Sequence, residues 1–185
     1  TPHALFSVED LQALRAAAFE PRISKVIAYD VCFDGLEVMT RPMPGPLRHL
    51  VRWLVRIDAR GPGNALIARL RERSRLLDWV VAQGMHITGA RTPMEFYAML
   101  ARHTMKTISD RVTQDVLLLA GEADHYIPTD HLQRQREALV NARSVCTRLF
   151  TAAEGGEQHC QVGRHQLAVD AIVEWLDAQC PPARG

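Results

Sequence analysis

The sequence has 185 residues, of which 47% are hydrophobic, and a formal net charge of +1 at pH 7. This length suits one domain, and the hydrophobic content is sufficient for a buried core. The near-neutral charge argues against nucleic acid as a partner. No apolar run approaches the roughly 18 residues of an integral membrane segment, and no secretory signal pattern opens the sequence.

The cysteine and histidine spacing is not that of a metal site. The sequence contains no Cys-x-x-Cys pair and no histidine pair at i and i+4, so we expect no metal and no cofactor. Scattered cysteines in a chain of this size indicate reduced thiols and a cytoplasmic protein. They are Cys32, Cys146, Cys160 and Cys180.

The first pattern in the chain is that of a helix from Ser7 to Phe19. Ser7 is a suitable N-cap, Asp10 occupies the reciprocal position of a capping box, and Pro21 follows the end. The run Lys25–Val31 is almost continuously apolar and rich in β-branched residues. It therefore predicts a parallel strand that is covered on both faces.

The middle of the chain is helical in pattern. From Pro42 to about Thr107 no segment has the pattern of a strand, and Pro, Gly and Asn residues separate the periodic segments. Four helices are predicted, at Leu47–Ala59, Ala65–Arg73, Leu76–Gln83 and Pro93–His103.

The first of these helices is amphipathic and basic. Arginines recur every four residues opposite an apolar stripe, which predicts either a solvated outer face or a surface for an anionic substrate or membrane. The arginines are Arg48, Arg52, Arg56 and Arg60, and the stripe is Leu47, Leu50, Val51, Leu54 and Val55.

Strands and helices alternate again after this region. Strands are predicted at 115–120 and 145–150, and helices at 130–141 and 164–179. The fold class is therefore α/β, with about three parallel strands, flanking helices and a helical insertion. The predicted division is residues 1–41 (core helix and strand), 42–108 (insertion), 109–180 (C-terminal core with an Asp and a His) and 181–185 (tail).

Two loops carry a candidate acid and base. Residues 116–128 read Val-Leu-Leu-Leu-Ala-Gly-Glu-Ala-Asp-His-Tyr-Ile-Pro, so Asp124 follows a buried strand. Residues 155–160 read Gly-Gly-Glu-Gln-His-Cys and place His159 after the last strand. A Ser-His-Asp hydrolase needs this pair, because the carboxylate orients the imidazole that takes the proton from the nucleophile.

These segments, together with Arg15–Ile23 (RAAAFEPRI) and Ala28-Tyr29-Asp30, resemble one subgroup of α/β-hydrolases. It is the subgroup of the dihydroxypseudooxynicotine hydrolase, related to dienelactone hydrolases and acylaminoacyl peptidases. The resemblance runs from about residue 7 to 179. It implies the C-terminal half of that fold, with the last three of eight strands and a helical cap over the active site.

The resemblance also implies a position for the nucleophile. In the subgroup, the serine of a Gly-x-Ser-x-Gly-Gly elbow lies twelve residues before a phenylalanine that corresponds to Phe19. The residue twelve positions before Phe19 in this sequence is Ser7. Leu5 and Glu9 stand where that elbow has glycines, so we expect a degenerate or missing elbow. The six upstream residues are too few for the strand that we expect before an elbow. If Ser7 is the nucleophile, the amide of Val8 contributes to the oxyanion hole.

Alternatives remain open for each role. Ser7 can be a simple helix N-cap, Asp124 a local turn residue and His159 a solvated histidine. Asp30 and Asp34, near the end of the preceding strand, are alternative acids. Cys160 is an alternative nucleophile that we disfavour, because neighbouring side chains on an extended loop point apart.

Together the residues and the resemblance predict a serine hydrolase with catalytic Ser7, Asp124 and His159. The substrate would be a small aromatic or apolar carbonyl compound, cleaved at an ester or carbon–carbon bond. The alternative is an inactive truncated remnant or the oligomerising half of a split hydrolase. Either way, the strand at 25–31 would lack its upstream neighbour, so we expect a homo-oligomer or an N-terminal half-chain to cover that edge.

Overall fold

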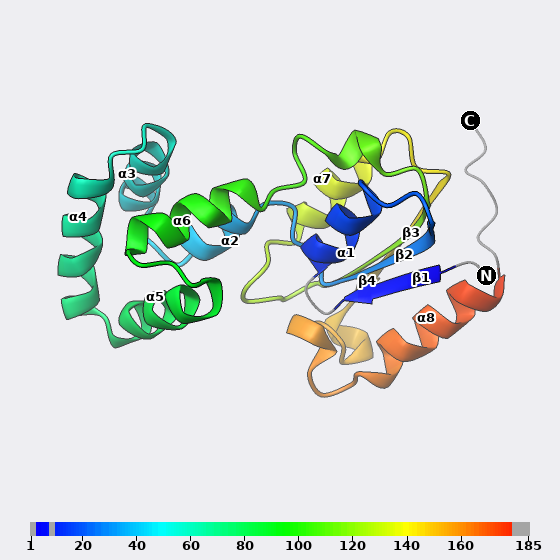
Figure 1. Cartoon of the computed structure of the whole chain (residues 1–185). Helices are drawn as coiled ribbons and strands as arrows, with labels where there is room; N and C mark the ends of the chain where they lie inside the picture. Colours follow the sequence, from blue (N-terminus) through cyan, green and yellow to red (C-terminus); the bar gives the residue numbers. More distant parts are fainter. Residues whose placement is uncertain (1–2, 8–9, 179–185) are drawn as a thin grey trace. The chain divides into compact units, whose positions relative to one another are not determined.

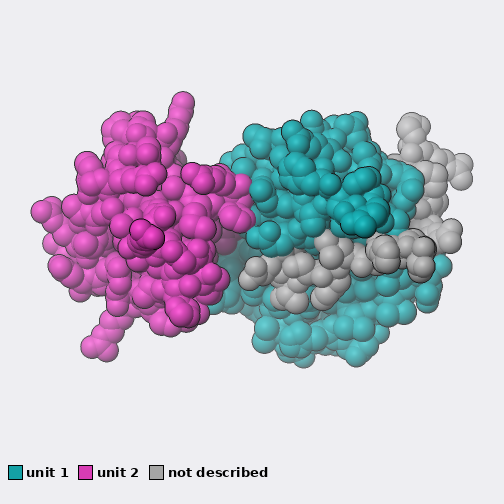
Figure 2. Space-filling view, in the orientation of Figure 1, with its two compact units in different colours: residues 1–34, 104–185 teal, residues 35–103 magenta. Residues whose placement is uncertain are grey.

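The computed structural model describes residues 3–7 and 10–178, and the side chains from Leu11 onward. The chain forms two compact units (Figure 2). The core unit comprises residues 1–34 and 104–185, and the helical unit comprises residues 35–103. Among the described residues, the core unit has two buried apolar clusters and the helical unit has one.

The core unit is built on a parallel sheet of four strands in the order β1-β2-β3-β4 (Figure 1). The strands are β1 (His3–Ser7), β2 (Ile23–Tyr29), β3 (Asp115–Gly121) and β4 (Ser144–Phe150). The three strands predicted from sequence are present, and the α/β class is confirmed. The additional strand is β1, which pairs with β2 from His3 opposite Ile23 to Ser7 opposite Ala28.

Strand β1 overturns two expectations. Ser7 ends a strand and does not cap a helix, and α1 begins later (Asp10–Ala17). The local cap pattern was outweighed because pairing along β2 satisfies the backbone of residues 3–7. The 25–31 strand is also not an exposed edge, because β2 lies between β1 and β3. The interface predicted there has lost its physical basis.

Helices cover both faces of this sheet (Figure 1). Helix α1 and α7 (Asp130–Ala138) lie on one face, and α8 (Gln166–Ala178) lies on the other. Alternate residues of β3 serve the two sides: Val116 and Leu118 join one apolar cluster, and Leu117 and Leu119 join the other. This double burial explains why the sequence of β3 is almost continuously apolar.

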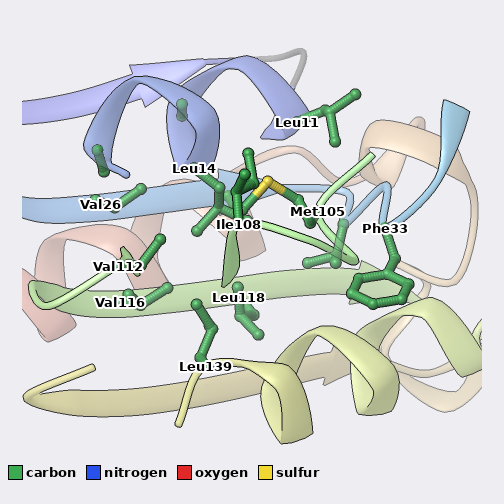
Figure 3. Close-up of a cluster of buried hydrophobic side chains, with 14 residues drawn as sticks. Leu11, Leu14, Val26, Phe33, Met105, Ile108, Val112, Val116, Leu118 and Leu139 are labelled. Carbon is green, nitrogen blue, oxygen red and sulfur yellow. The ribbon is translucent and has the colours of Figure 1, made fainter. Parts of the chain in front are cut away.

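The first cluster packs α1 and α7 onto the sheet (Figure 3). Leu14 of α1 and Leu118 of β3 are both fully buried in it. The loop after the helical unit contributes Met105 and Ile108, next to a short 3-10 helix, η1 (Ser109–Arg111). The cluster holds the strand ends in fixed positions, which is what a site at those ends requires.

The helical unit contains five helices within its residues. They are α2 (Gly35–Thr40), α3 (Gly45–Arg56), α4 (Arg60–Arg73), α5 (Arg75–Thr88) and α6 (Pro93–Arg102). The four predicted helices are present as α3 to α6, and α2 was not predicted. Serine and threonine caps explain two of the boundaries, since Ser74 accepts from the Leu77 amide and Thr92 from the Glu95 amide.

The arginine face of α3 is only partly solvated. Arg60, which was predicted to belong to this face, is instead the first residue of α4. Arg56 is exposed, whereas Arg52 is half-buried against α2. Its guanidinium donates to Thr40 Oγ1 at 2.8 Å and to the Glu37 carbonyl at 3.3 Å. Arg52, one arginine of the predicted cationic face, therefore connects α3 to α2 through hydrogen bonds.

Two further observations bear on the initial expectations. Within the described residues, no helix is long and apolar enough to cross a membrane. Cys146 is disulfide-bonded, whereas Cys32 and Cys160, which also lie in the described part of the chain, are not. The expectation of four reduced cysteines is thus wrong for Cys146, because the spatial proximity that a disulfide needs cannot be derived from sequence spacing.

Candidate functional site

The polar residues predicted for the site follow successive strands of the sheet. Ser7 is the last residue of β1, Asp30 comes directly after β2, Asp124 follows β3 and His159 follows β4. The carboxyl ends of parallel strands lie at one edge of a sheet, which is where ligands bind in open α/β folds. Four consecutive strands thus deliver polar residues to the same edge.

Asp124 is held in place by its own turn. Its Oδ1 accepts hydrogen bonds from the amides of Tyr126 at 2.7 Å and Ile127 at 2.9 Å. Only 3% of its side chain is exposed. This is the Asx-turn geometry that aspartate supports in loops, and it fixes the carboxylate before any partner binds.

His159 completes the pair. Its Nδ1 lies 2.8 Å from Asp124 Oδ2, so the expected hydrogen bond is present. An ionised carboxylate can only accept, so Nδ1 carries the proton and Nε2 is the nitrogen left to receive one. The side chain is 29% exposed, which leaves the ring accessible to a reacting group.

The contact shifts the pKa of both partners. The hydrogen bond to Asp124 raises the pKa of His159 against the opposing effect of burial, and the negative charges of Asp124 and Asp30 add to the rise. For Asp124, burial acts to raise the pKa. The hydrogen bonds from His159 and from the Ile127 and Tyr126 amides outweigh it and lower the pKa below its usual value.

The loop that carries His159 has its own supports. A short 3-10 helix, η2 (Ala152–Glu154), has a capping box in which Thr151 and Glu154 bond reciprocally. Arg148 of β4 contacts Glu154, and the Ala152 amide donates to Glu122 at 3.1 Å. Gly155 then turns the chain with a φ of +73°, a conformation that glycine adopts without strain.

The two alternative acids differ in position. Asp30 Oδ2 lies 3.2 Å from His159 Nδ1, which is within reach but farther than Asp124. Asp34 pairs with Lys106 Nζ at 2.7 Å and accepts from Thr104 at 3.3 Å. The geometry therefore favours Asp124 as the partner of the imidazole, and it brings Asp30, but not Asp34, to the same ring.

The position of Ser7 is known from its backbone. It pairs with Ala28 in the register of β1 and β2, two residues before Asp30. Val8, the expected oxyanion donor, and Glu9, at a glycine position of the elbow, lie outside the described residues. Contrary to expectation, a strand does precede Ser7.

Several neighbours of the pair were not singled out from the sequence. The ring of Tyr126 packs edge-on against His159 with 5.0 Å between centroids, and the His125 ring lies 6.2 Å away. Tyr126 is 56% exposed and so flanks the site from the solvent side. The signal available in the sequence was an aromatic residue two positions after Asp124.

One cluster has potential metal ligands. Among the described residues, Asp30, His159 and Cys160 place one oxygen, nitrogen and sulfur ligand atom within 4.8 Å of one another. Spacing along the chain did not indicate this grouping. However, Asp30 already accepts the Cys160 amide, and His159 Nδ1 faces Asp124, so the observed contacts are those of a hydrogen-bond network.

Comparison with known proteins gives one sequence relative and a set of similar structures. No protein-family model matches the chain. It is 27% identical over 177 residues to the hydrolase acrC of Aspergillus aculeatus, covering 94% of this chain and 40% of that protein. The chain therefore spans less than half the length of this relative.

Three of the similar structures carry the names of hydrolases. The Pyrococcus furiosus esterase Pf2001 matches with a TM-score of 0.55 and 13% identity, covering 94% of this chain and 52% of the esterase. The Paleococcus ferrophilus monoacylglycerol lipase matches with a TM-score of 0.53 and 23% identity, covering 96% and 68%. An α/β hydrolase, GrgF from Penicillium, matches with a TM-score of 0.51. With the parallel sheet described above, these likenesses show that the chain has the α/β-hydrolase fold.

Proposed function

We propose that this chain carries the catalytic residues of a serine hydrolase, with Asp124 as acid, His159 as base and Ser7 as nucleophile. The observation that carries the proposal is the 2.8 Å contact between His159 Nδ1 and Asp124 Oδ2 at the carboxyl edge of the sheet. The position of Ser7 at the end of the strand next to β2 supports its role.

The chemistry follows from the protonation states. Neutral His159 accepts the Ser7 hydroxyl proton on Nε2 while the serine oxygen attacks the substrate carbonyl carbon. The resulting imidazolium is stabilised by ionised Asp124, and it returns the proton to the leaving group as the bond to the carbonyl carbon breaks. Water then gives a proton to the same imidazole and attacks the acyl carbon, and the imidazolium returns that proton to the Ser7 oxygen as its bond to the acyl group breaks.

The substrate class is proposed from the cap that the family resemblance implies. We infer that the helical unit supplies specificity for a small aromatic or apolar carbonyl compound, cleaved at an ester or carbon–carbon bond. Its insertion between β2 and β3 in the sequence supports this role. No cofactor is needed for this reaction, because serine, histidine and aspartate provide every proton transfer.

A second candidate is a folded protein with little or no turnover. Leu5 and Glu9 support it, since they occupy the positions where an elbow has glycines. The strand before Ser7 removes one of the arguments for inactivity, but not this one. We therefore expect slow turnover of activated esters.

The test is covalent labelling of the full chain with a fluorophosphonate, with the modified residue located by mass spectrometry. We expect slow labelling of Ser7 that disappears in Ser7→Ala and in His159→Gln. His86→Gln is the matched control, because His86 is an exposed histidine of α5, and it should label like the parent chain. Labelling at another residue, or none at high reagent concentration, would refute the assignment of Ser7.

A further inference from the structure

Asp30 is a buried carboxylate in a strained position beside the proposed pair. Its residue is 1% exposed and its φ is +67°, in the left-handed region that few residues other than glycine adopt. Its amide and that of Val31 both donate to the Leu119 carbonyl, at 3.0 and 3.2 Å. Strain of this kind persists only where the surroundings hold it, and here β3 does so.

The carboxylate of Asp30 binds the turn that follows His159. Its Oδ2 accepts the Cys160 amide, and its Oδ1 accepts Gln161 Nε2 at 3.2 Å. The hydroxyl of Tyr29 donates to the Cys160 carbonyl at 2.9 Å. Two consecutive residues at the end of β2 therefore hold both backbone polar groups of the residue next to His159.

This turn needs such support. Cys160 and Gln161 have φ values of +51° and +46°, so two successive non-glycine residues lie in the left-handed region. Each costs of order 1–3 kcal/mol unless other contacts compensate. Gln161 is fully buried, so its bond to Asp30 is also shielded from water.

Asp30 and Asp124 both lie close to His159 Nδ1, but they make different contacts. Nδ1 has one proton, and Asp124 holds the shorter contact, at 2.8 Å against 3.2 Å. Both carboxylate oxygens of Asp30 accept hydrogen bonds from the turn, from the Cys160 amide and from Gln161 Nε2. We propose that Asp30 is a positioning residue, which fixes the turn His159–Gln161 and so keeps the imidazole on Asp124. Its effect on catalysis rests on the function proposed above, but its effect on the geometry does not.

Three substitutions distinguish the hydrogen bonds that Asp30 makes to the turn from the effect of its negative charge. Asp30→Asn keeps an oxygen for the Cys160 amide, and its NH₂ can donate to Gln161 Oε1, a buried atom with no hydrogen bond among the described residues. Asp30→Ala removes both bonds. Tyr29→Phe leaves Asp30 intact and removes only the bond to the Cys160 carbonyl.

The readout is proton NMR of the His159 ring in the full chain, assigned by its loss in His159→Gln. We expect the downfield Nδ1 proton of the bond to Asp124 to persist in Asp30→Asn, to vanish in Asp30→Ala and to weaken in Tyr29→Phe. In ester hydrolysis, kcat should fall about 100-fold in Asp30→Ala with KM little changed, and stay close to parental in Asp30→Asn.

Three results would overturn the proposal. If Asp30→Asn loses the signal as Asp30→Ala does, Asp30 acts through its charge. If Asp30→Ala folds and keeps the signal, Asp30 has no positioning role. If Asp30→Ala does not fold, as judged by circular dichroism, an unchanged signal in Tyr29→Phe shows that the hydrogen bonds to the Cys160 backbone do not position His159. Absence of hydrolysis in the parent chain would count against the proposed function alone, because the NMR readout needs no turnover.

Discussion

Gly121, the last residue of β3, lies directly against the carbonyl oxygen of Glu157. A Cβ placed on Gly121 would be only 2.4 Å from that oxygen, and the same oxygen accepts the Ala123 amide at 2.9 Å. The turn that presents Asp124 and the loop that presents His159 are therefore joined through their backbones. The side chains of Asp124 and His159 meet because the backbones of the two loops are already packed together at Gly121 and Glu157.

The close approach predicts a large effect of Gly121→Ala. The added methyl group would force the 157–158 backbone away, and overpacking of this kind costs roughly 1–3 kcal/mol. We expect a lower midpoint of urea unfolding and weaker His159–Asp124 contact. Gly61→Ala is the control, since a Cβ added there meets nothing within 4 Å beyond its own neighbouring backbone, and it should be neutral or slightly stabilising. Equal stability of the two variants would show that the loops are not tightly coupled.

Asp124→Asn should lower kcat strongly and should lower the free energy of unfolding much less. The amide cannot hold the imidazole in the required tautomer, and the matching change costs roughly 10⁴-fold in kcat in a serine protease with this triad. We expect a fall of at least about 100-fold here, measured with an activated ester. Asp177→Asn, at an exposed position of α8, is the control. A loss shared by both variants would point to a general effect of charge.

The pH dependence follows from the raised pKa of His159. Catalysis needs the neutral imidazole, so the acid limb of kcat/KM should lie above the ordinary histidine value of 6.5. The sign for stability is opposite. The protonated ring stabilises the fold fully below pH 6.5, and this contribution is lost as the pH rises through the folded-state pKa. NMR titration of the ring checks the direction, and a value at or below 6.5 would contradict it.

In Asp124→Asn the His159 pKa should fall, because the main cause of its rise is removed. The acid limb of the remaining activity should then move to lower pH. Asp124 itself stabilises the fold at pH values above its unfolded pKa, and that contribution disappears as the pH falls through its lowered folded value. An acid limb that does not move would show that another group sets it.

Leu118→Ala tests the core under the site. Leu118 of β3 is fully buried in the cluster that packs α1 and α7 onto the sheet, so its truncation leaves a cavity that costs about 2–5 kcal/mol. Val140→Ala, at a position that is 70% exposed, should change stability by less than about 0.5 kcal/mol. Urea unfolding followed by circular dichroism distinguishes them. A similar midpoint for both would mean that this cluster does not stabilise the core unit.

Local patterns in the sequence determined much of the core. Continuous apolar runs predicted β2 and β3, because parallel strands buried on both faces need apolar residues at nearly every position, and the alternation of strand and helix patterns predicted β4. Asp124 and His159 were found because each lies in a loop that follows a predicted strand. Parallel strands end at one edge, so the expectation that these side chains meet needed only the order of the strands.

Tertiary structure decided what depends on partners distant in the sequence. Ser7 resembles a helix N-cap locally, and only pairing with β2 makes residues 3–7 a strand. The hydrogen bond from the Cys160 amide to Asp30 joins residues 130 positions apart, and the left-handed backbone at Cys160 has no sequence signature. A short strand and a strained turn are both set by long-range hydrogen bonds, whose free energy exceeds local preference and is invisible to a pattern of neighbouring residues.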